Sequence, residues 1–144
     1  ASNVNTSVSY TEPLTSALNL GLSYKLTNTI NHSINDSYNK DAANNYTQLD
    51  QLYSNNFDFE QLRNQASLTV RYKSDKVNVN LVNQLRKDDL FQRNNYLGKE
   101  IKRDFLTFNP SLNFSYNLTK TKALIANIRR TNQLPSLSQI NPLR

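Results

Sequence analysis

The sequence has 144 residues, enough for one ordinary domain, of which 37% are hydrophobic, and its formal net charge is +6. Apolar runs stay far below the roughly 18 residues of a membrane helix, and the absence of cysteine excludes disulfides, thiol catalysis and thiolate metal sites. The basic residues are scattered and form no basic run, so we expect no nucleic-acid partner.

Alternation of apolar and polar residues predicts two strands in the N-terminal part, over residues 3–11 and 17–28. A turn around Pro13 separates them, since proline removes a ladder donor and fixes φ. Residues 29–56 are mostly Asn, Ser, Asp and Tyr and are predicted to form a long polar loop. Such a loop is unusual in a compact soluble domain and is often functional.

A second predicted pair of strands covers residues 60–73 and 76–87, with a tight polar turn between them. Their apolar residues again fall at every second position, through Leu68 and Val70 in the first strand. Residues 88–102 lose the alternation and are predicted to form a second long polar loop.

The last predicted strands, residues 103–118 and 123–131, have the most regular pattern. Leu112 and Phe114 alternate with Asn and Ser, so one face is apolar and the other polar. The first arm exceeds the five or six residues of a typical soluble strand and reaches the length that a tilted strand needs to cross a bilayer. Residues 132–144 form a third irregular segment.

Short and long connections therefore alternate along the chain, and in an up-and-down meander all the short turns then lie at one end. This arrangement is typical of bacterial outer-membrane barrels, in which only every second strand residue must be apolar. The mean hydropathy of −0.70 is compatible with such a barrel. The predicted fold is all-β: an antiparallel up-and-down meander of about six strands, part of a larger transmembrane β-barrel.

Three tyrosines give a partly independent indication of a membrane. Tyr10, Tyr72 and Tyr116 each lie in the apolar phase, close before a short turn. A common level of amphipathic rings is what a membrane-interface girdle requires. The alternative explanation, that tyrosine simply favours strands, does not predict that the three rings lie at a common level.

The polar faces and the long loops contain the candidate binding residues. Alternation predicts that the polar residues face the lumen, where they bind water, each other or a plug domain; they include Arg71, Arg86, Asn113 and Arg129. Ligand capture is expected to use loop aromatics, which bury large areas; the candidates are Tyr38, Tyr46, Tyr53, Phe91 and Tyr96. Packing of these rings within their own loops is an equally good interpretation.

No pattern indicates catalysis, a metal or a cofactor. The only histidine, His32, falls in the first long loop, where it is expected to be solvated. Asp88-Asp89, and Asp50 with Asp58 and Glu60, lack the glycine and the oxygen spacing of a known calcium loop, so we expect them to be solvated loop acids. We therefore expect a protein that is not an enzyme.

Several short motifs resemble one family in their order and spacing. They are Tyr10–Leu14, Leu49-Asp50, Ser54–Asn56, Asn109–Leu112, Phe114–Tyr116, Arg130, Pro135-Ser136 and Gln139–Pro142. Together they resemble, over nearly the whole chain, the barrel of TonB-dependent outer-membrane receptors, especially their outer membrane protein β-barrel relatives.

This resemblance implies one part of a transporter in the bacterial outer membrane, with about 22 strands and a plugged lumen. It implies import of a scarce ligand, such as an iron chelate, cobalamin, a glycan or a peptide. The implied partners are the lipid bilayer, a plug domain, the remaining barrel strands and a TonB-type energy-coupling complex. Six strands are fewer than the roughly eight of the smallest membrane barrels, so the expectation is a partial barrel.

The alternative is a soluble β-rich binding or adhesion module whose apolar faces pack together as a sandwich. That alternative predicts buried apolar side chains and no requirement for lipid.

Overall fold

The structure is a computed structural model that describes residues 1–133, apart from the side chain of Asn55. Six strands form one antiparallel sheet: β1 (Ser2–Pro13), β2 (Leu18–Asn35), β5 (Asn55–Lys73), β6 (Val77–Asn94), β7 (Lys99–Asn117) and β8 (Ala123–Arg129). A separate two-stranded sheet pairs β3 (Tyr38–Lys40) with β4 (Tyr46–Leu49). The predicted six-stranded meander is therefore confirmed.

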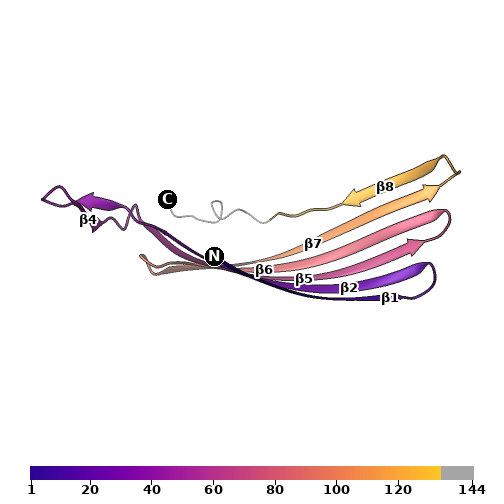
Figure 1. The fold of residues 1–144 in the computed structure, drawn as a ribbon, viewed down its shortest axis with the longest axis horizontal. Coiled ribbons are helices and arrows are strands. Elements are labelled where there is room, and N and C mark those ends of the chain that lie inside the picture. The colour runs from indigo at the N-terminus through magenta and orange to yellow at the C-terminus, as the bar shows by residue number, and fades with distance from the viewer. Residues whose placement is uncertain (134–144) are drawn as a thin grey trace. The chain divides into compact units, whose positions relative to one another are not determined.

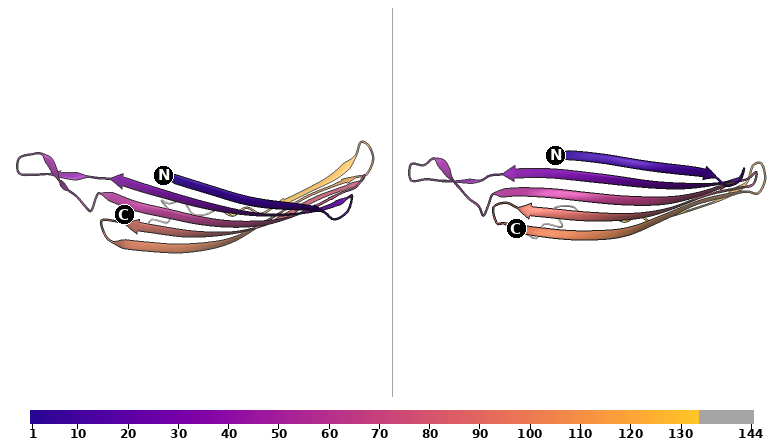
Figure 2. Two further views of the ribbon diagram at one scale, coloured as in Figure 1. Left: turned by 60° about the horizontal axis from the view of Figure 1, so that its bottom comes forward. Right: turned by 90° about the horizontal axis from the view of Figure 1, so that it is seen from below.

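The strand order in the large sheet is β1-β2-β5-β6-β7-β8, so every strand lies beside its sequence neighbours once the β3–β4 hairpin is set aside. Figures 1 and 2 show the strands running in alternate directions within one layer. The sheet is unclosed, and β1 and β8 are its two edges in the part of the chain that is described. Within residues 1–133, no helix has the length and the apolar character to cross a membrane.

Contacts divide the described residues into two units, which are treated separately below. Unit 1 consists of Ala1–Thr6, Leu26–Arg63 and Asp88–Asp104. Unit 2 consists of Ser7–Lys25, Asn64–Lys87 and the described residues from Phe105 onward. The three short turns belong to unit 2, and the β3–β4 hairpin belongs to unit 1.

The strands extend well beyond the predicted ranges, and this corrects two predicted loops. Residues 88–102 are mainly strand, because β6 continues to Asn94 and β7 already begins at Lys99. Gly98, with φ of 63°, allows the short turn between them. Residues 29–56 likewise contain the end of β2, the β3–β4 hairpin and the start of β5. These extensions mix many polar residues with scattered apolar ones such as Ile30, Leu90 and Phe91, so no sustained alternation marks them in the sequence. The third predicted loop, 132–144, lies outside the described residues from 134 onward.

The β7–β8 hairpin has the register that the alternation predicts. Its facing pairs are Ser111 and Arg129, Leu112 and Ile128, Asn113 and Asn127, Phe114 and Ala126, Ser115 and Ile125, Tyr116 and Leu124, and Asn117 and Ala123. Facing residues share one side of a sheet, so apolar side chains pair with apolar ones and polar with polar. Ile125 and Ala123 are the exceptions, since they lie opposite Ser115 and Asn117 on the polar face.

Little apolar surface is buried in the described residues. Leu90, 7% exposed, is the buried hydrophobic residue, whereas Leu106 is 69% exposed and Ile128 is 65% exposed. A soluble sandwich requires two apolar faces packed against each other. The single layer therefore does not support the soluble alternative.

Candidate functional site

Exposed apolar side chains gather on one face of unit 2, called the apolar face below. Its members are Val8, Tyr10, Leu22, Tyr24, Leu68, Tyr72, Leu85, Leu106, Phe108, Leu124 and Ile128, all at least a third exposed. In each strand they occupy alternate positions, and the β7–β8 register places Leu124 and Ile128 beside apolar partners. A contiguous apolar surface of this kind marks a site of contact with a membrane or another protein.

Three strand segments within unit 2 have the length that a bilayer crossing requires. They are residues 64–73 of β5, 77–87 of β6 and 105–117 of β7. A tilted transmembrane strand needs about 9–11 residues. The apolar face thus covers strands of membrane-spanning length.

The predicted girdle tyrosines lie near the strand ends that lead into the short turns. Tyr10 precedes the end of β1 at Pro13, and its hydroxyl donates a hydrogen bond to Glu12. Tyr72 and Tyr116 are the penultimate residues of β5 and β7. Whether the three rings share one level in a membrane stays a prediction.

The four predicted lumen residues lie in the polar phase of unit 2. The Arg71 Nε donates to Asn80 Oδ1 at 3.4 Å, across β5 and β6. The Arg86 Nη2 donates to the Asn132 carbonyl oxygen at 3.4 Å. In the β7–β8 register, Arg129 lies opposite Ser111, and Asn113 lies opposite Asn127.

Gly21 lies on this polar face, between two threonines of neighbouring strands. A Cβ on this residue would lie 3.5 Å from the Thr69 Cβ and 3.7 Å from the Thr11 Oγ1. Those distances are ordinary van der Waals contacts, so the site has room for a methyl group but for little more.

A buried carboxylate in unit 1 was missed by the sequence reasoning. Asp88 is 0% exposed, and its Oδ1 accepts hydrogen bonds from Arg63 Nε at 2.6 Å and Gln61 Nε2 at 2.8 Å. The expectation of a solvated loop acid was therefore wrong for Asp88. The available signal was the spacing of Gln61 and Arg63, which continues the polar phase of β5.

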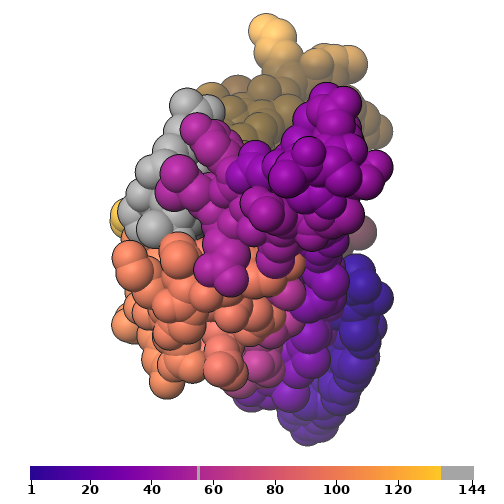
Figure 3. Space-filling model, turned by 90° about the vertical axis from the view of Figure 1, so that its left-hand side faces the viewer, coloured from indigo at the N-terminus to yellow at the C-terminus, as the bar shows by residue number. Residues whose placement is uncertain are grey.

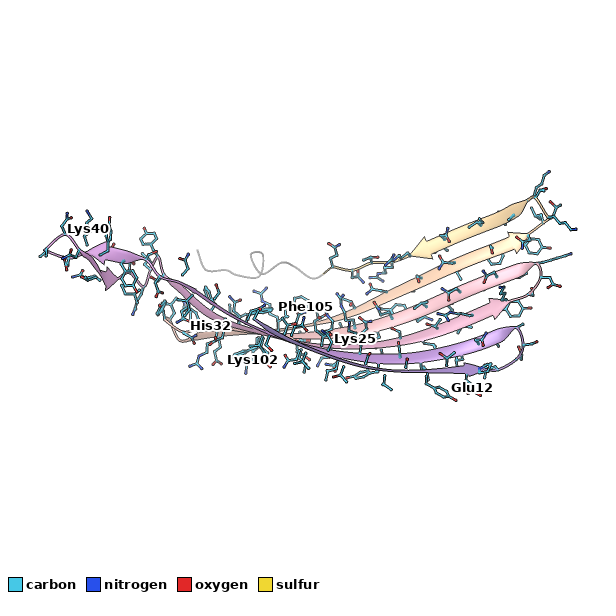
Figure 4. All side chains as sticks on the ribbon, viewed as in Figure 1. Glu12, Lys25, His32, Lys40, Lys102 and Phe105 are labelled. Atoms are coloured by element: carbon cyan, nitrogen blue, oxygen red, sulfur yellow. The ribbon has the colours of Figure 1, made fainter. Side chains whose placement is uncertain are left out.

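A second polar cluster in unit 1 joins β2, β5 and the β6–β7 turn. His32 lies in β2, half exposed, with its Nδ1 2.5 Å from the Asp58 Oδ1 (Figure 4). Asn95 donates to Asp58 Oδ2 at 2.8 Å and to Asn56 Oδ1 at 2.9 Å. The Asn95 hydrogen bond, followed by that of His32, lowers the pKa of Asp58. The prediction of a solvated loop histidine is corrected, since His32 is a strand residue with a carboxylate partner.

Three of the five predicted ligand aromatics lie on or beside the β3–β4 hairpin. Tyr46 and Tyr53 are 67% and 71% exposed, and Tyr38 is 46% exposed. The Lys40 ammonium lies 5.2 Å from the centroid of the Tyr46 ring, a cation–π distance. Figure 3 shows the side chains of this hairpin at the surface of unit 1.

Two aspartates fix the turns of this hairpin. Asp41 accepts hydrogen bonds from the backbone N–H groups of Asn45 and Ala43 and from the Thr47 hydroxyl, which lower its pKa. Asp50 accepts from the Asn39 side chain and from the N–H groups of Leu52 and Tyr53, which lower its pKa as well. The exposed rings are thus presented on turns held by side-chain oxygens.

The other two aromatics belong to the β6–β7 hairpin. Phe91 lies in β6 with the Lys102 ammonium 5.5 Å from its ring centroid. Tyr96 lies in the turn and donates its hydroxyl to Asp36, and this bond raises the pKa of Tyr96. Tyr38 adds a smaller raising effect, so Tyr38 and Tyr96 lie close enough to interact.

The described residues contain no group of three or more His, Asp or Glu side chains arranged to hold a metal ion. Of the carboxylates considered for calcium, Asp50 and Asp58 are already hydrogen-bonded to protein donors. The described side chains are better suited to surface contacts and to hydrogen bonds with water than to metal binding.

Comparison with known proteins gives one match. The family described as "Outer membrane protein beta-barrel family" matches the chain over residues 1–144. No curated protein and no solved structure matches the chain.

Proposed function

This chain belongs to the outer membrane protein beta-barrel family, a protein class of the bacterial outer membrane, and we propose that it forms part of the wall of a TonB-dependent receptor. The receptor imports a scarce ligand, which is an iron chelate, cobalamin, a glycan or a peptide. The observation that carries the proposal is the apolar face of unit 2, where exposed apolar side chains cover strands of membrane-spanning length.

The opposite face of unit 2 suits a lumen. Arg71, Arg86, Asn113 and Arg129 contribute hydrogen-bonding groups that can bind water or a plug domain. Arginine at these positions offers several donors in a fixed geometry, which suits backbone carbonyls and carboxylates of a docked domain. Transport then proceeds by displacement of the plug, and the wall itself performs no catalysis.

The unpaired edges favour a larger assembly. β1 and β8 are not hydrogen-bonded to each other in the described sheet, and six strands fall below the eight of the smallest closed barrels. Unpaired backbone groups are costly in lipid, so further strands are expected to pair with both edges. Residues 1–144 are thus a segment of a barrel with more strands.

Ligand capture is assigned to the aromatic residues of unit 1. Tyr38, Tyr46 and Tyr53 present exposed rings on the anchored β3–β4 segment, and Phe91 and Tyr96 lie on the β6–β7 hairpin. Tyr rings offer a large apolar area and a polar hydroxyl, which suits glycans, peptides and aromatic chelates. Tyr10, Tyr72 and Tyr116 are assigned to the membrane interface near the short turns.

The test is uptake by bacteria that make the protein naturally. Cells with and without the gene are compared for accumulation of ferric chelates, cobalamin, oligosaccharides and peptides. The proposal predicts that one class is taken up only with the gene, and that collapse of the proton gradient abolishes the uptake. Gene-dependent uptake that survives this collapse would show a passive pore and would overturn the TonB-dependent assignment. Equal uptake of all four classes with and without the gene would contradict the transport assignment itself.

A further inference from the structure

A hollow in unit 2 lies between two neighbouring short turns. Its volume is about 720 Å³, and it is lined by Asp75 and Lys76 of the β5–β6 turn and by residues 117–123 around the β7–β8 turn. The Asn117 N–H donates to the Lys76 carbonyl oxygen at 2.8 Å, which fixes the two turns side by side. Figure 1 shows these connections at the same end of the sheet.

The lining of this hollow, called the lysine hollow below, is cationic. Lys76, Lys120 and Lys122 contribute three ammonium groups, and Asp75 contributes one carboxylate. Asp75 and Glu12 are the only acidic residues in the described part of unit 2, so little charge of the opposite sign is available nearby. An anion is the complementary occupant.

Apolar side chains lie in and next to the lysine hollow. Leu118, 60% exposed, lines the hollow, and the facing pair Tyr116 and Leu124 is the next register position after Asn117 and Ala123, which line it. A group of lysines at the rim of an apolar surface suits a molecule with an anionic head and an apolar tail. Lysine side chains reach such heads by laying their methylene stems along apolar surface.

We propose that the lysine hollow binds the phosphate-containing head group of an anionic phospholipid at the short-turn side of the membrane. The inference rests on the proposed membrane position of the apolar face. The acyl chains then lie along Tyr116 and Leu124, and the lysines contact the phosphate. The shallow and open site suits a lipid head group better than a free metabolite, because the bilayer supplies the apolar half of the contact.

The experiment measures the lipid preference of the whole barrel that contains this chain, inserted into vesicles of phosphatidylglycerol and phosphatidylcholine. Native mass spectrometry of the protein released from these vesicles reports which phospholipid it retains. The expected result is retention of phosphatidylglycerol over phosphatidylcholine. Each lysine near an anionic membrane surface contributes about 1 kcal/mol, so each Lys→Gln change reduces the preference by about five-fold.

The variants are Lys76→Gln, Lys120→Gln and Lys122→Gln, singly and together. Lys99→Gln is the matched control, because Lys99 also flanks a hairpin turn but lies outside the hollow. Loss of the preference in the triple variant and its retention in the control support the site. An unchanged preference in a triple variant that inserts normally would overturn it.

Three further measurements keep the result interpretable. The first measurement applies if the triple variant fails to insert. The lipid preference of the unmodified protein must then fall with added sodium chloride, because salt screens exposed charges. A preference that does not change with salt overturns the proposal. Inorganic phosphate at matched ionic strength must displace no more lipid than sodium chloride does; stronger displacement assigns the hollow to free phosphate. Insertion into phosphatidylcholine vesicles, followed by protease protection, separately reports on the membrane position, so failure of the lipid site is distinguishable from failure of the barrel-wall proposal.

Discussion

Asp88 shows how a single residue can hold the polar side of this sheet together. Its side chain is fully buried and accepts hydrogen bonds from Gln61 and Arg63 across β5 and β6. A buried carboxylate that loses a charged donor retains a desolvation penalty. Arg63 is one-third exposed, so water offsets part of that loss.

Replacing Arg63 with Gln is therefore expected to destabilise unit 1 by about 1.5–3 kcal/mol, the range for hydrogen bonds to charged groups. The measurement is urea unfolding of the protein in vesicles. Arg93→Gln is the matched control, because Arg93 and Glu100 are both about half exposed and 3.9 Å apart. Such surface pairs contribute roughly 0–1 kcal/mol. Equal effects of the two changes would contradict the role given to Asp88.

The cluster of His32, Asp58 and Asn95 predicts a pH dependence. The pKa of Asp58 is lower in the folded protein, so the unfolded chain takes up the proton first as the pH falls. The stabilising contribution is complete above the ordinary aspartate pKa of about 3.9 and is lost as the pH falls through the lower folded value.

Asn95→Ala removes the largest cause of the lowered pKa and is expected to move the Asp58 titration toward the ordinary value. Carboxyl NMR of isotope-labelled protein in detergent micelles measures this titration. Asn56→Ala serves as a comparison, because Asn56 accepts a hydrogen bond from Asn95, whereas the Asn95 side chain donates directly to Asp58. An unchanged Asp58 titration in Asn95→Ala would show that Asn95 does not hold the carboxylate.

At the scale of the element, β7 shows how far alternation predicts structure. The sequence predicted which residues share a face, and the β7–β8 register has Leu112 opposite Ile128 and Asn113 opposite Asn127. It did not predict the extension of β7 to Lys99, where charged and polar residues occupy both faces. There, hydrogen bonds between strands stabilise the sheet, and these leave no hydropathy pattern.

The same limit applies to the candidate site. The sequence predicted that Arg71 and Arg86 lie on the polar face, because side chains alternate between the two faces of a strand with a period of two residues. The bond of Asp88 to Arg63 joins residues 25 positions apart, and the pair is recognisable only once the strand pairing is known. The β3–β4 hairpin was missed because Asn, Asp and Tyr dominate a segment whose turns depend on side-chain hydrogen bonds.

Arginine substitutions along β7 are expected to separate its two faces. Leu112→Arg or Phe114→Arg places a charge in the lipid and is expected to cost about 2–4 kcal/mol near the bilayer midplane. Asn113→Arg is expected to be tolerated, because that face is wet and Asn127 lies opposite. Unfolding in vesicles measures all three. Equal destabilisation at Asn113 and Phe114 would indicate that both faces are buried.

At the scale of the whole molecule, the chain forms one open sheet and belongs to an outer-membrane barrel family. The described sheet has two unpaired edges, and the apolar face of unit 2 lacks a packing partner within the described residues. We propose that a bilayer covers the apolar face and that additional strands pair with the edges. The central claim is that the two faces of unit 2 contact lipid and a wet lumen respectively.

Cysteine labelling tests this claim directly, since the chain has no cysteine of its own. Single cysteines replace Ser111, Leu112, Asn113, Phe114 and Ser115 in turn, and intact outer membranes are treated with a water-soluble maleimide. The account predicts period-two labelling, fast at Ser111, Asn113 and Ser115 and slow at the two apolar positions. Uniform labelling along β7, or the opposite alternation, would contradict it.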